Sequence, residues 1–591
     1  MKITDVRSTL RSAKDSSHRR VRSARPAAAM LIAIAACAAM VSCGGEGDEA
    51  EATGTNLAAN GAPSNNTPAR GPVVADGSAT PAPEGSEGPG AVAGAAGGAN
   101  LPEVDDNDPN LAPPPRRGGG GGGNNNVNND RDNCEDSTCE ADGGECQGNT
   151  CVFLCDEDAD ECNDEEVECP DNIDCRVECI DDDTCSQKIT CPNNANCDIQ
   201  CEENDTCTAE IDCGGADVCE VSCLGDDSCS AGFTFAGAND DVNVDCQGNR
   251  TCTGAIECGQ IGNCDITCVG DDSCSGALDL GAEVANLSCD GDGSCTGAIL
   301  CDDNGEDCNI QCDGIDSCTQ NIACGVAALV TSCDIDCLGN GSCAGGITCN
   351  AEQCLLACDG DSCTGDVACG VADGDTVDCS ITCGDDSCDG NVTCNTVDGD
   401  CDLICNAAGA CGGALNCNAD EGLCRIDCGA DDTCANTVTC NSTDDCAILC
   451  DNDQACIGAV SCNSEEGTCN INCGANVAGS CAAAVSCNSD ENCTLTCNAD
   501  QSCLGAVTCT SEANCAIACG GDGACTNTVT CAPGDNNCDI NCNGVGACDA
   551  GQAISCTADD TCDVDCGNNQ TCVQNVACTA NIQNNDCPAA I

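Results

Sequence analysis

Apolar and polar positions alternate within a short unit that recurs along most of this 591-residue chain. The unit contains the pattern C-x-Φ-x-C, in which the middle residue Φ is always apolar, as at Val177, Ile199 and Ile266. A second segment follows, whose residue two places before its closing cysteine is apolar in nearly every unit, as at Ile189 and Ile256. Residues at i, i+2 and i+4 share one face of a strand, so this period of two predicts β-strands rather than helices.

The cysteines set the length of the unit. From Cys134 to Cys587 they recur as C-x3-C, usually followed by x5-C and again x5-C, and the period is 21 to 25 residues. We call these four positions a, b, c and d. Gly, Asn and Asp fill the intervening segments, as turns require. A fixed period of this size indicates a solenoid.

The predicted fold is therefore all-β. Residues 134–591 should form a disulfide-laced, flattened parallel β-solenoid of about 20 coils, each of about 22–23 residues, with aliphatic and cysteine columns inside. At about 4.8 Å per coil its length would be roughly 95 Å. The alternative is a string of small independent disulfide knots, which would not need an aliphatic residue at the same offset in every unit.

Two units lack the same two cysteines, and this predicts the disulfide pairing. Position d is Phe235 where the following a is Val242, and d is Leu280 where the following a is Ala285. Partners of one bond should be lost together, so d bonds the following a, and b bonds c by elimination. Twenty b–c bonds and 18 d–a bonds would use all 76 cysteines from Cys134 onward. The examples are Cys258 with Cys264 and Cys268 with Cys274. Bonds between stacked coils are the alternative, because a spacing of about 4.8 Å also suits a disulfide.

Composition supports an extracytoplasmic, oxidised protein. The chain has 78 cysteines, no Trp, no Tyr and three Phe, so disulfides take the place of large aromatics in the core. Zinc binding is disfavoured because no C-x2-C pair occurs and the single histidine is His18.

The charge excludes nucleic acid as a partner. The formal net charge is −85, and phosphate recognition needs Lys and Arg. From Cys134 onward the only basic residues are Arg176, Lys188, Arg250 and Arg425. Such a polyanion should stay soluble, repel its own copies and attract cations.

The N-terminus predicts export and lipidation. Residues 1–42 have a basic start and a short apolar run, which is typical of a secretory signal. The run ends Met40-Val41-Ser42-Cys43 and resembles the bacterial lipobox, which implies lipidation of Cys43. An ordinary signal cut near Ala39 is the alternative. Gly44 is not the Asp associated with inner-membrane retention, so the expected location is the outer membrane, with surface exposure.

A tether separates this anchor from the repeats. Residues 43–133 are rich in Gly, Ala, Pro and Asn, and such a segment cannot bury enough apolar surface to fold. We expect a disordered linker.

Catalytic chemistry is not predicted. After the signal the chain has no histidine, the cysteines are even in number, and Lys188 is the single lysine of the repeats. A polysaccharide-acting β-helix enzyme is the weakest alternative, since sugar sites usually offer aromatic platforms.

Calcium is the candidate ligand. Many b–c turns read G-D-D-S or close to it, as at Gly225 to Ser228 and Gly270 to Ser273, and stacked turns would form a ladder of carboxylates that suits Ca²⁺. The competing interpretation is that Asp and Asn favour turns. The calcium candidates are Asp182, Asp183, Asp205, Asp226, Asp227, Asp271, Asp272 and Asp292.

Ice or crystal binding is a third hypothesis. The repeats are similar in architecture to the cysteine-laced β-solenoid antifreeze proteins of insects, which present a file of outward Thr-x-Thr. Here Thr437 and Thr439 fit, as do Thr526, Thr528 and Thr530. Neighbouring coils offer Ala, Glu, Asp or Ser instead, so the file is broken.

The unit C-x-I-x-C-x-G-D-D-S-C-x-G-x-[IV]-x-C covers nearly all of Cys134 to Cys587. It resembles the acidic cysteine-repeat surface lipoproteins of uncharacterised function in Gram-negative bacteria. The resemblance implies a location and no mechanism. We expect a non-enzymatic structural or adhesive rod, whose partners are the membrane through its lipid, divalent cations, and a matrix or cell-surface component.

Overall fold

The computed structural model describes residues 134, 139–140, 143–156, 162–163, 165–235, 237, 241–259, 261–301, 307–325, 330–370, 378–474, 478–534, 536–549, 553–567 and 576–580. All of them belong to one compact unit, residues 121–591. The predicted signal (1–42), the lipidation site Cys43 and the tether (43–133) lie outside the described residues.

Two long sheets make up the described fold. Sheet A has 20 strands, and all its pairings are parallel except that of β1 with β2. Its strands are β1 (Glu145–Gln147), β2 (Thr150–Cys155), β4 (Asp174–Cys179), β6 (Cys197–Cys201), β8 (Val218–Cys223), β10 (Asp241–Cys246), β12 (Asn263–Cys268), β14 (Val284–Cys289), β16 (Asp307–Cys312), β18 (Ser332–Cys337), β20 (Gln353–Cys358), β22 (Asp378–Cys383), β24 (Cys401–Cys405), β26 (Cys424–Cys428), β28 (Cys446–Cys450), β30 (Cys469–Cys473), β32 (Cys493–Thr496), β34 (Cys515–Ala518), β36 (Cys538–Asn541) and β38 (Cys562–Asp565).

Sheet B is parallel throughout its described strands, which pair in succession from β3 to β39. They are β3 (Val167–Glu168), β5 (Ile189–Thr190), β7 (Ile211–Asp212), β9 (Gly232–Thr234), β11 (Ala255–Glu257), β13 (Leu278–Asp279), β15 (Ile299–Cys301), β17 (Ile322–Cys324), β19 (Ile347–Cys349), β21 (Val367–Cys369), β23 (Val392–Thr396), β25 (Leu415–Ala419), β27 (Val438–Ser442), β29 (Val460–Ser464), β31 (Val485–Ser489), β33 (Val507–Ser511), β35 (Val529–Pro533), β37 (Ile554–Ala558) and β39 (Val576–Ala580).

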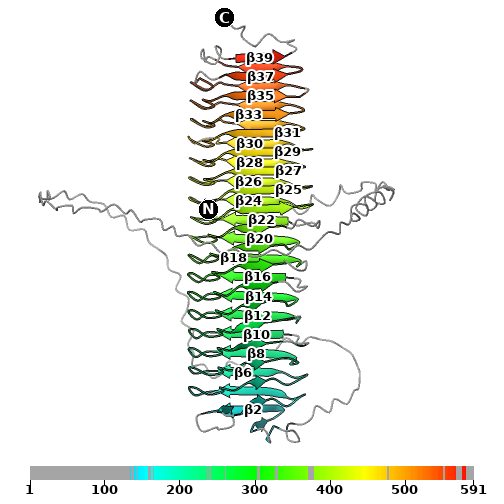
Figure 1. Cartoon of the computed structure of the whole chain (residues 1–591), viewed down its shortest axis with the longest axis vertical. Helices are drawn as coiled ribbons and strands as arrows, with labels where there is room; N and C mark the ends of the chain where they lie inside the picture. The colour runs from blue at the N-terminus through cyan, green and yellow to red at the C-terminus, as the bar shows by residue number, and fades with distance from the viewer. Residues whose placement is uncertain are drawn as a thin grey trace, which may run out of the picture. The chain divides into compact units, whose positions relative to one another are not determined.

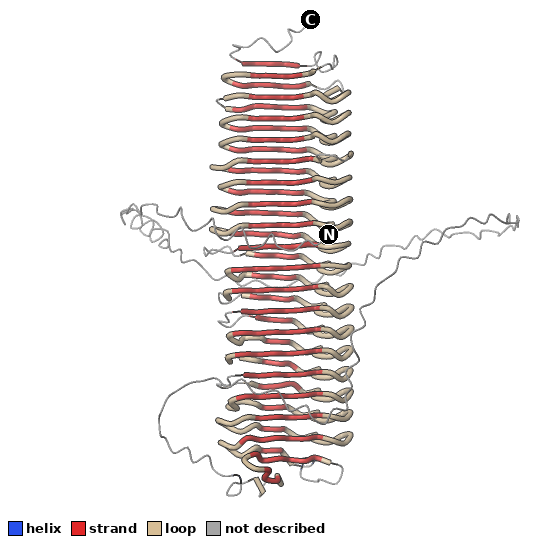
Figure 2. Tube along the Cα trace, turned by 180° about the vertical axis from the view of Figure 1, so that it is seen from behind, coloured by secondary structure: helices blue, strands red, loops and turns tan. Residues whose placement is uncertain are grey.

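Each coil consists of one strand of sheet A, a b–c turn, one strand of sheet B and a d–a turn. Successive coils stack in register, so that Ile266 faces Leu287 and Cys268 faces Cys289 across β12 and β14. Figures 1 and 2 show the resulting column of parallel rungs. The predicted disulfide-laced parallel β-solenoid is therefore confirmed.

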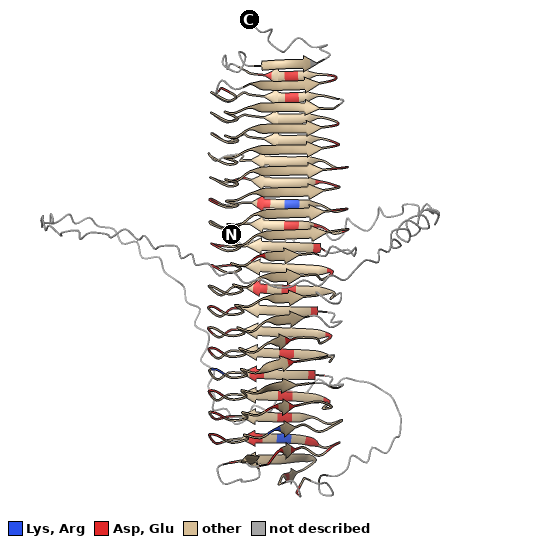
Figure 3. Cartoon of the chain, in the orientation of Figure 1, with Lys and Arg blue, Asp and Glu red and all other residues tan. Residues whose placement is uncertain are grey.

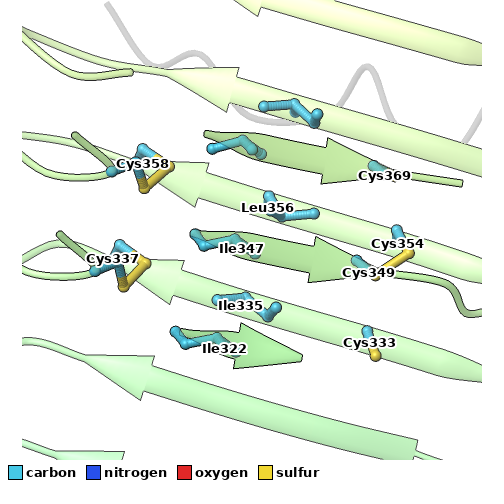
Figure 4. Packing of buried hydrophobic residues seen from close by; sticks show 14 of the residues in the cluster. Ile322, Cys333, Ile335, Cys337, Ile347, Cys349, Cys354, Leu356, Cys358 and Cys369 are labelled. Carbon is cyan, nitrogen blue, oxygen red and sulfur yellow. A yellow bond between two sulfur atoms is a disulfide. The ribbon is translucent and has the colours of Figure 1, made fainter. Parts of the chain in front are cut away.

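The core is a narrow layer between the two sheets. Along a strand, buried and outward residues alternate, and the buried ones are the aliphatic and cysteine positions of the repeat. Figure 4 shows Ile335 and Leu356 of sheet A interleaved with Ile322 and Ile347 of sheet B, and cysteines close the layer on both sides. The period of two in the sequence thus corresponds directly to the buried face.

Disulfides cross-link the coils across the turns at both lateral edges. Cys268 is bonded to Cys274 across a b–c turn, and Cys258 to Cys264 across a d–a turn, each six residues apart. The same two classes recur along the described coils, except where Phe235 and Leu280 replace the d cysteine, and the Cα atoms are about 6 Å apart, as in Cys312–Cys318 (6.1 Å). Both are the pairs that the shared losses of d and a predict.

The first four repeat cysteines depart from this rule. They pair as Cys134–Cys146 and Cys139–Cys151, each 12 residues apart, whereas the rule would join Cys134 to Cys139. The physical reason is that β1 runs antiparallel to β2, so this segment is a hairpin rather than a coil. This short antiparallel strand is the first edge strand of sheet A.

Apolar side chains fill the two places where a d–a disulfide is missing. Phe235 and Leu280 stand at d, Val242 and Ala285 stand at the following a, and all four are buried. Phe233 also stacks on Phe235, with ring centroids 6.0 Å apart. These coils keep their core without the bond.

Among the described residues, no helix is long and apolar enough to cross a membrane.

Candidate functional site

The b–c turn needs a left-handed residue two places before c. Asp183, Asp205, Asp227 and Asp272 all occupy that position, with φ between 55° and 61°. Arg250 takes it in another coil with φ 55°, and glycine takes it elsewhere. Asp, Asn and Gly tolerate this region best, so the backbone alone accounts for an aspartate here.

The neighbouring position, three residues before c, links successive coils. The Asp182 Oδ1 accepts the Asn204 N–H (3.2 Å), the Asn204 Oδ1 accepts the Asp226 N–H (3.0 Å), and the Asp226 Oδ1 accepts the Asn249 N–H (2.9 Å). Asp292 accepts the Ile315 N–H in the same way. Neutral Asn and charged Asp alternate in this role, so the ladder itself does not require a carboxylate.

The structure thus places the eight calcium candidates in two stacked columns, one at each of these turn positions. Asp271 stands in the linking column, where its N–H is donated to the Asn249 Oδ1. Sulfur atoms also come together, as at Cys155, Cys179 and Cys185, but these cysteines are disulfide-bonded and a metal ligand must be a thiolate.

All four basic residues of the repeats form ion pairs. Arg176 pairs with Glu178 and Asp198, Lys188 with Asp212, Arg250 with Asp227, and Arg425 with Asp402 and Asp427. The hydrogen bond to Asp212 raises the pKa of Lys188 above its usual value. Lys188 is therefore a positively charged partner of a carboxylate.

The outer face of sheet A carries acidic residues that the turn motif did not reveal. Partial burial raises the pKa of Asp336, and the nearby Asp334 and Asp313 raise it further. Burial likewise raises the pKa of Asp539, with Asp563 and Asp565 adding to the effect. Figure 3 shows acidic residues on strands as well as turns along the stack. Like charges therefore meet on strands as well as in the turns.

A groove of about 1000 Å³ runs along the outer face of sheet B, over β23, β25, β27, β29 and β31. Its floor is a column of asparagines, each directly after the d cysteine of its coil: Asn395, Asn418, Asn441, Asn463 and Asn488. Asp420, Glu465 and Asp490 line it as well. The motif C-N-[STA], which recurs in these five coils, is the sequence signal that would have located it.

Strand register also revises the threonine file. Thr439 lies inside β27 and stacks on Asn416 and Ser461. Thr530 of β35 lies in the same column, but Ser461 and Ser486 stand between Thr439 and the pair Thr508–Thr530, so the file is interrupted. A second groove, of about 570 Å³, lies on sheet A over Asn286 and Asn309.

No protein family model, curated protein or solved structure matches the chain. Its fold defines its class, which is a cysteine-rich, disulfide-laced parallel β-solenoid.

Proposed function

We propose that the protein is a non-enzymatic, lipid-anchored rod at the cell surface, with a structural or adhesive role. The observation that carries the proposal is the in-register stack of coils from β2 to β39, stapled along both edges. At about 4.8 Å per coil, these strands span roughly 90 Å. In such a repeat each coil contacts only its neighbours, and the disulfides restrain every coil separately.

The N-terminal sequence supports the location. Met40 to Cys43 provides a lipobox-like acylation site, and residues 43–133 provide a tether between anchor and rod. As a flexible coil of about 90 residues, the tether would have a mean span of roughly 50 Å.

The net negative charge of the repeats supports a rod that projects away from the cell surface. The four basic residues of the repeats are already paired with carboxylates, so most of the acidic surface is left uncompensated. Such rods repel one another and other anionic surfaces, which favours separated, upright molecules.

Divalent cation binding is a second proposal, favoured by the carboxylates whose pKa values are raised. Asp336 with Asp334, and Asp539 with Asp563, hold like charges together on sheet A. Ca²⁺ bound or condensed there would relieve the repulsion between these carboxylates. The two turn columns, from Asp182 to Asp292, would bind Ca²⁺ in the same way.

Complementation of a gene deletion tests the first proposal. We expect the deletion to reduce adhesion, cell spacing or envelope integrity, and the full chain to restore it. A shortened chain lacking residues 308–378 should restore it only in part. This deletion removes three whole coils, and Cys379 then takes the place of Cys308 as partner of Cys301. A deletion strain unchanged in all three properties would contradict the proposal.

A further inference from the structure

The C-terminal half of sheet B differs in charge from the rest of the protein. Its nine strands from β23 to β39 contain no Asp, Glu, Lys or Arg. Earlier strands of the same sheet do contain them, as Glu168, Asp212, Glu257 and Asp279 show. In a chain with a net charge of −85, these strands are thus uncharged, and the acidic residues of the groove, Asp420, Glu465 and Asp490, follow the strands rather than lie in them.

The floor of the groove on this face is a hydrogen-bonded ladder. Asn418 donates to the Asn395 Oδ1 (2.8 Å), Asn441 to the Asn418 Oδ1 (2.7 Å), and Asn463 to the Asn441 Oδ1 (2.8 Å). Each amide has two N–H donors and two acceptor lone pairs. At Asn418 and Asn441 the ladder uses one of each, which leaves each of these amides one further donor and one further acceptor.

The backbone behind the floor is held in place. Ser442 is buried and donates to the Gly422 carbonyl of the preceding coil (2.8 Å), and Ser489 donates likewise to the Gly467 carbonyl (2.7 Å). The amides therefore form a preorganised row with a spacing of about 4.8 Å. Binding groups that are already ordered lose little entropy when a ligand arrives.

We infer that this groove, whose described lining contains no aromatic residue, binds an uncharged polysaccharide chain along the rod axis through hydrogen bonds rather than aromatic stacking. A sugar hydroxyl both donates and accepts hydrogen bonds, which matches the donor and acceptor left at Asn418 and Asn441. A polymer of such units can repeat the contact from coil to coil, over roughly 20 Å for the five coils of the groove.

Other occupants fit less well. Asp420, Glu465 and Asp490 line the groove and would repel an anionic polymer. A metal ion is coordinated only by the amide oxygens, so the amide N–H donors would be left without an acceptor. A second copy of the chain carries the same negative charge, and an apolar partner would leave the amides unpaired.

The inference deepens the proposed adhesive role and rests on it. The test uses the purified mature protein with insoluble and soluble neutral glycans, with alginate as an anionic polymer and with the cells' own surface polysaccharide. The neutral glycans and the cells' own polymer distinguish an external ligand from an envelope component. We expect retention on neutral chains, unaffected by a chelator, and no retention on alginate.

The variant Asn418→Leu/Asn441→Leu should bind at least roughly tenfold more weakly, because it loses two of the amides that would hydrogen-bond the chain. Asn286→Leu/Asn309→Leu is the matched control, since it removes a similar amide pair on sheet A, and it should bind as the native protein does. If the first variant misfolds, Asn441→Asp keeps the side-chain shape but loses the N–H donors, and it should also weaken binding.

Absence of binding to every neutral glycan would overturn the inference. So would unchanged binding by both groove variants, or binding that depends on a divalent cation or on self-association. Because this assay uses purified protein, it can fail while the rod remains displayed on cells, so it is separable from the test of the proposed function.

Discussion

Removal of one b–c disulfide should loosen one coil and leave the remainder of the rod intact. The variant Cys268→Ala/Cys274→Ala opens a bond between residues six positions apart. Closing such a short loop restricts the unfolded chain by roughly 2 kcal/mol. Cys274 has φ 49°, a left-handed conformation in which alanine is strained as much as cysteine is. Glycine is not strained there, so Cys268→Ala/Cys274→Gly should recover a net 0.5 kcal/mol or so, after its own entropy cost is subtracted.

Hydrogen exchange is the suitable assay, because the chain has no Trp or Tyr for intrinsic fluorescence. Amides of β12 and β14 should exchange roughly 30-fold faster in the alanine variant, since about 1.4 kcal/mol corresponds to a factor of ten. Strands several coils away should be unchanged, because coils contact only their neighbours. Cys258→Ala/Cys264→Ala is the matched control, because it opens a bond with the same separation of six at the opposite edge. Its effect should be equally local. Faster exchange along the whole stack, or none anywhere, would refute this reasoning.

Three further predictions concern the anchor, cations and pH. Mass spectrometry should find an acylated Cys43 as the mature N-terminus, and Cys43→Ser should release the protein from membranes; an unmodified terminus at another residue would remove the anchor. Millimolar Ca²⁺ should raise the unfolding temperature more than Na⁺ of equal ionic strength, whereas equal effects would indicate diffuse counterions. The pKa values of Asp336 and Asp539 lie above their usual 3.8, so the folded state binds these protons more tightly than the unfolded state. The stability that these groups contribute should therefore fall as pH rises through the folded pKa. Asp336→Asn removes the buried charge and should raise the unfolding temperature at pH 7. An unchanged or lower unfolding temperature would argue against burial as the cause of the raised pKa.

The fold could be predicted from the sequence because every coil repeats the same pattern of buried positions. Every coil repeats the offset of residues such as Ile199 and Ile266, so the buried face could be assigned without tertiary information. The paired losses at Phe235 and Val242 also led to the disulfide classes found in the structure. The hairpin at β1 was missed because its cysteines fit the same spacing, although Cys134 pairs with Cys146.

The candidate sites were harder to predict. The motif G-D-D-S drew attention to turn aspartates such as Asp227, whose place follows from a left-handed backbone and whose carboxylate pairs with Arg250. The groove escaped notice because its asparagines are 22 to 25 residues apart in sequence. Strand register shows that Asn418 and Asn441 are neighbours, as their shared place after the d cysteine would have indicated.

Electron tomography of intact cells tests the central proposal most directly. Cells that express the full chain should show rods of roughly 90 Å standing off the outer membrane on short tethers. Removal of residues 308–378, which takes out three coils, should shorten the rods by about 14 Å and leave their number unchanged. Full-length protein that is present in the cells but forms no rods at the surface, or rods whose length does not follow the number of coils, would contradict the account.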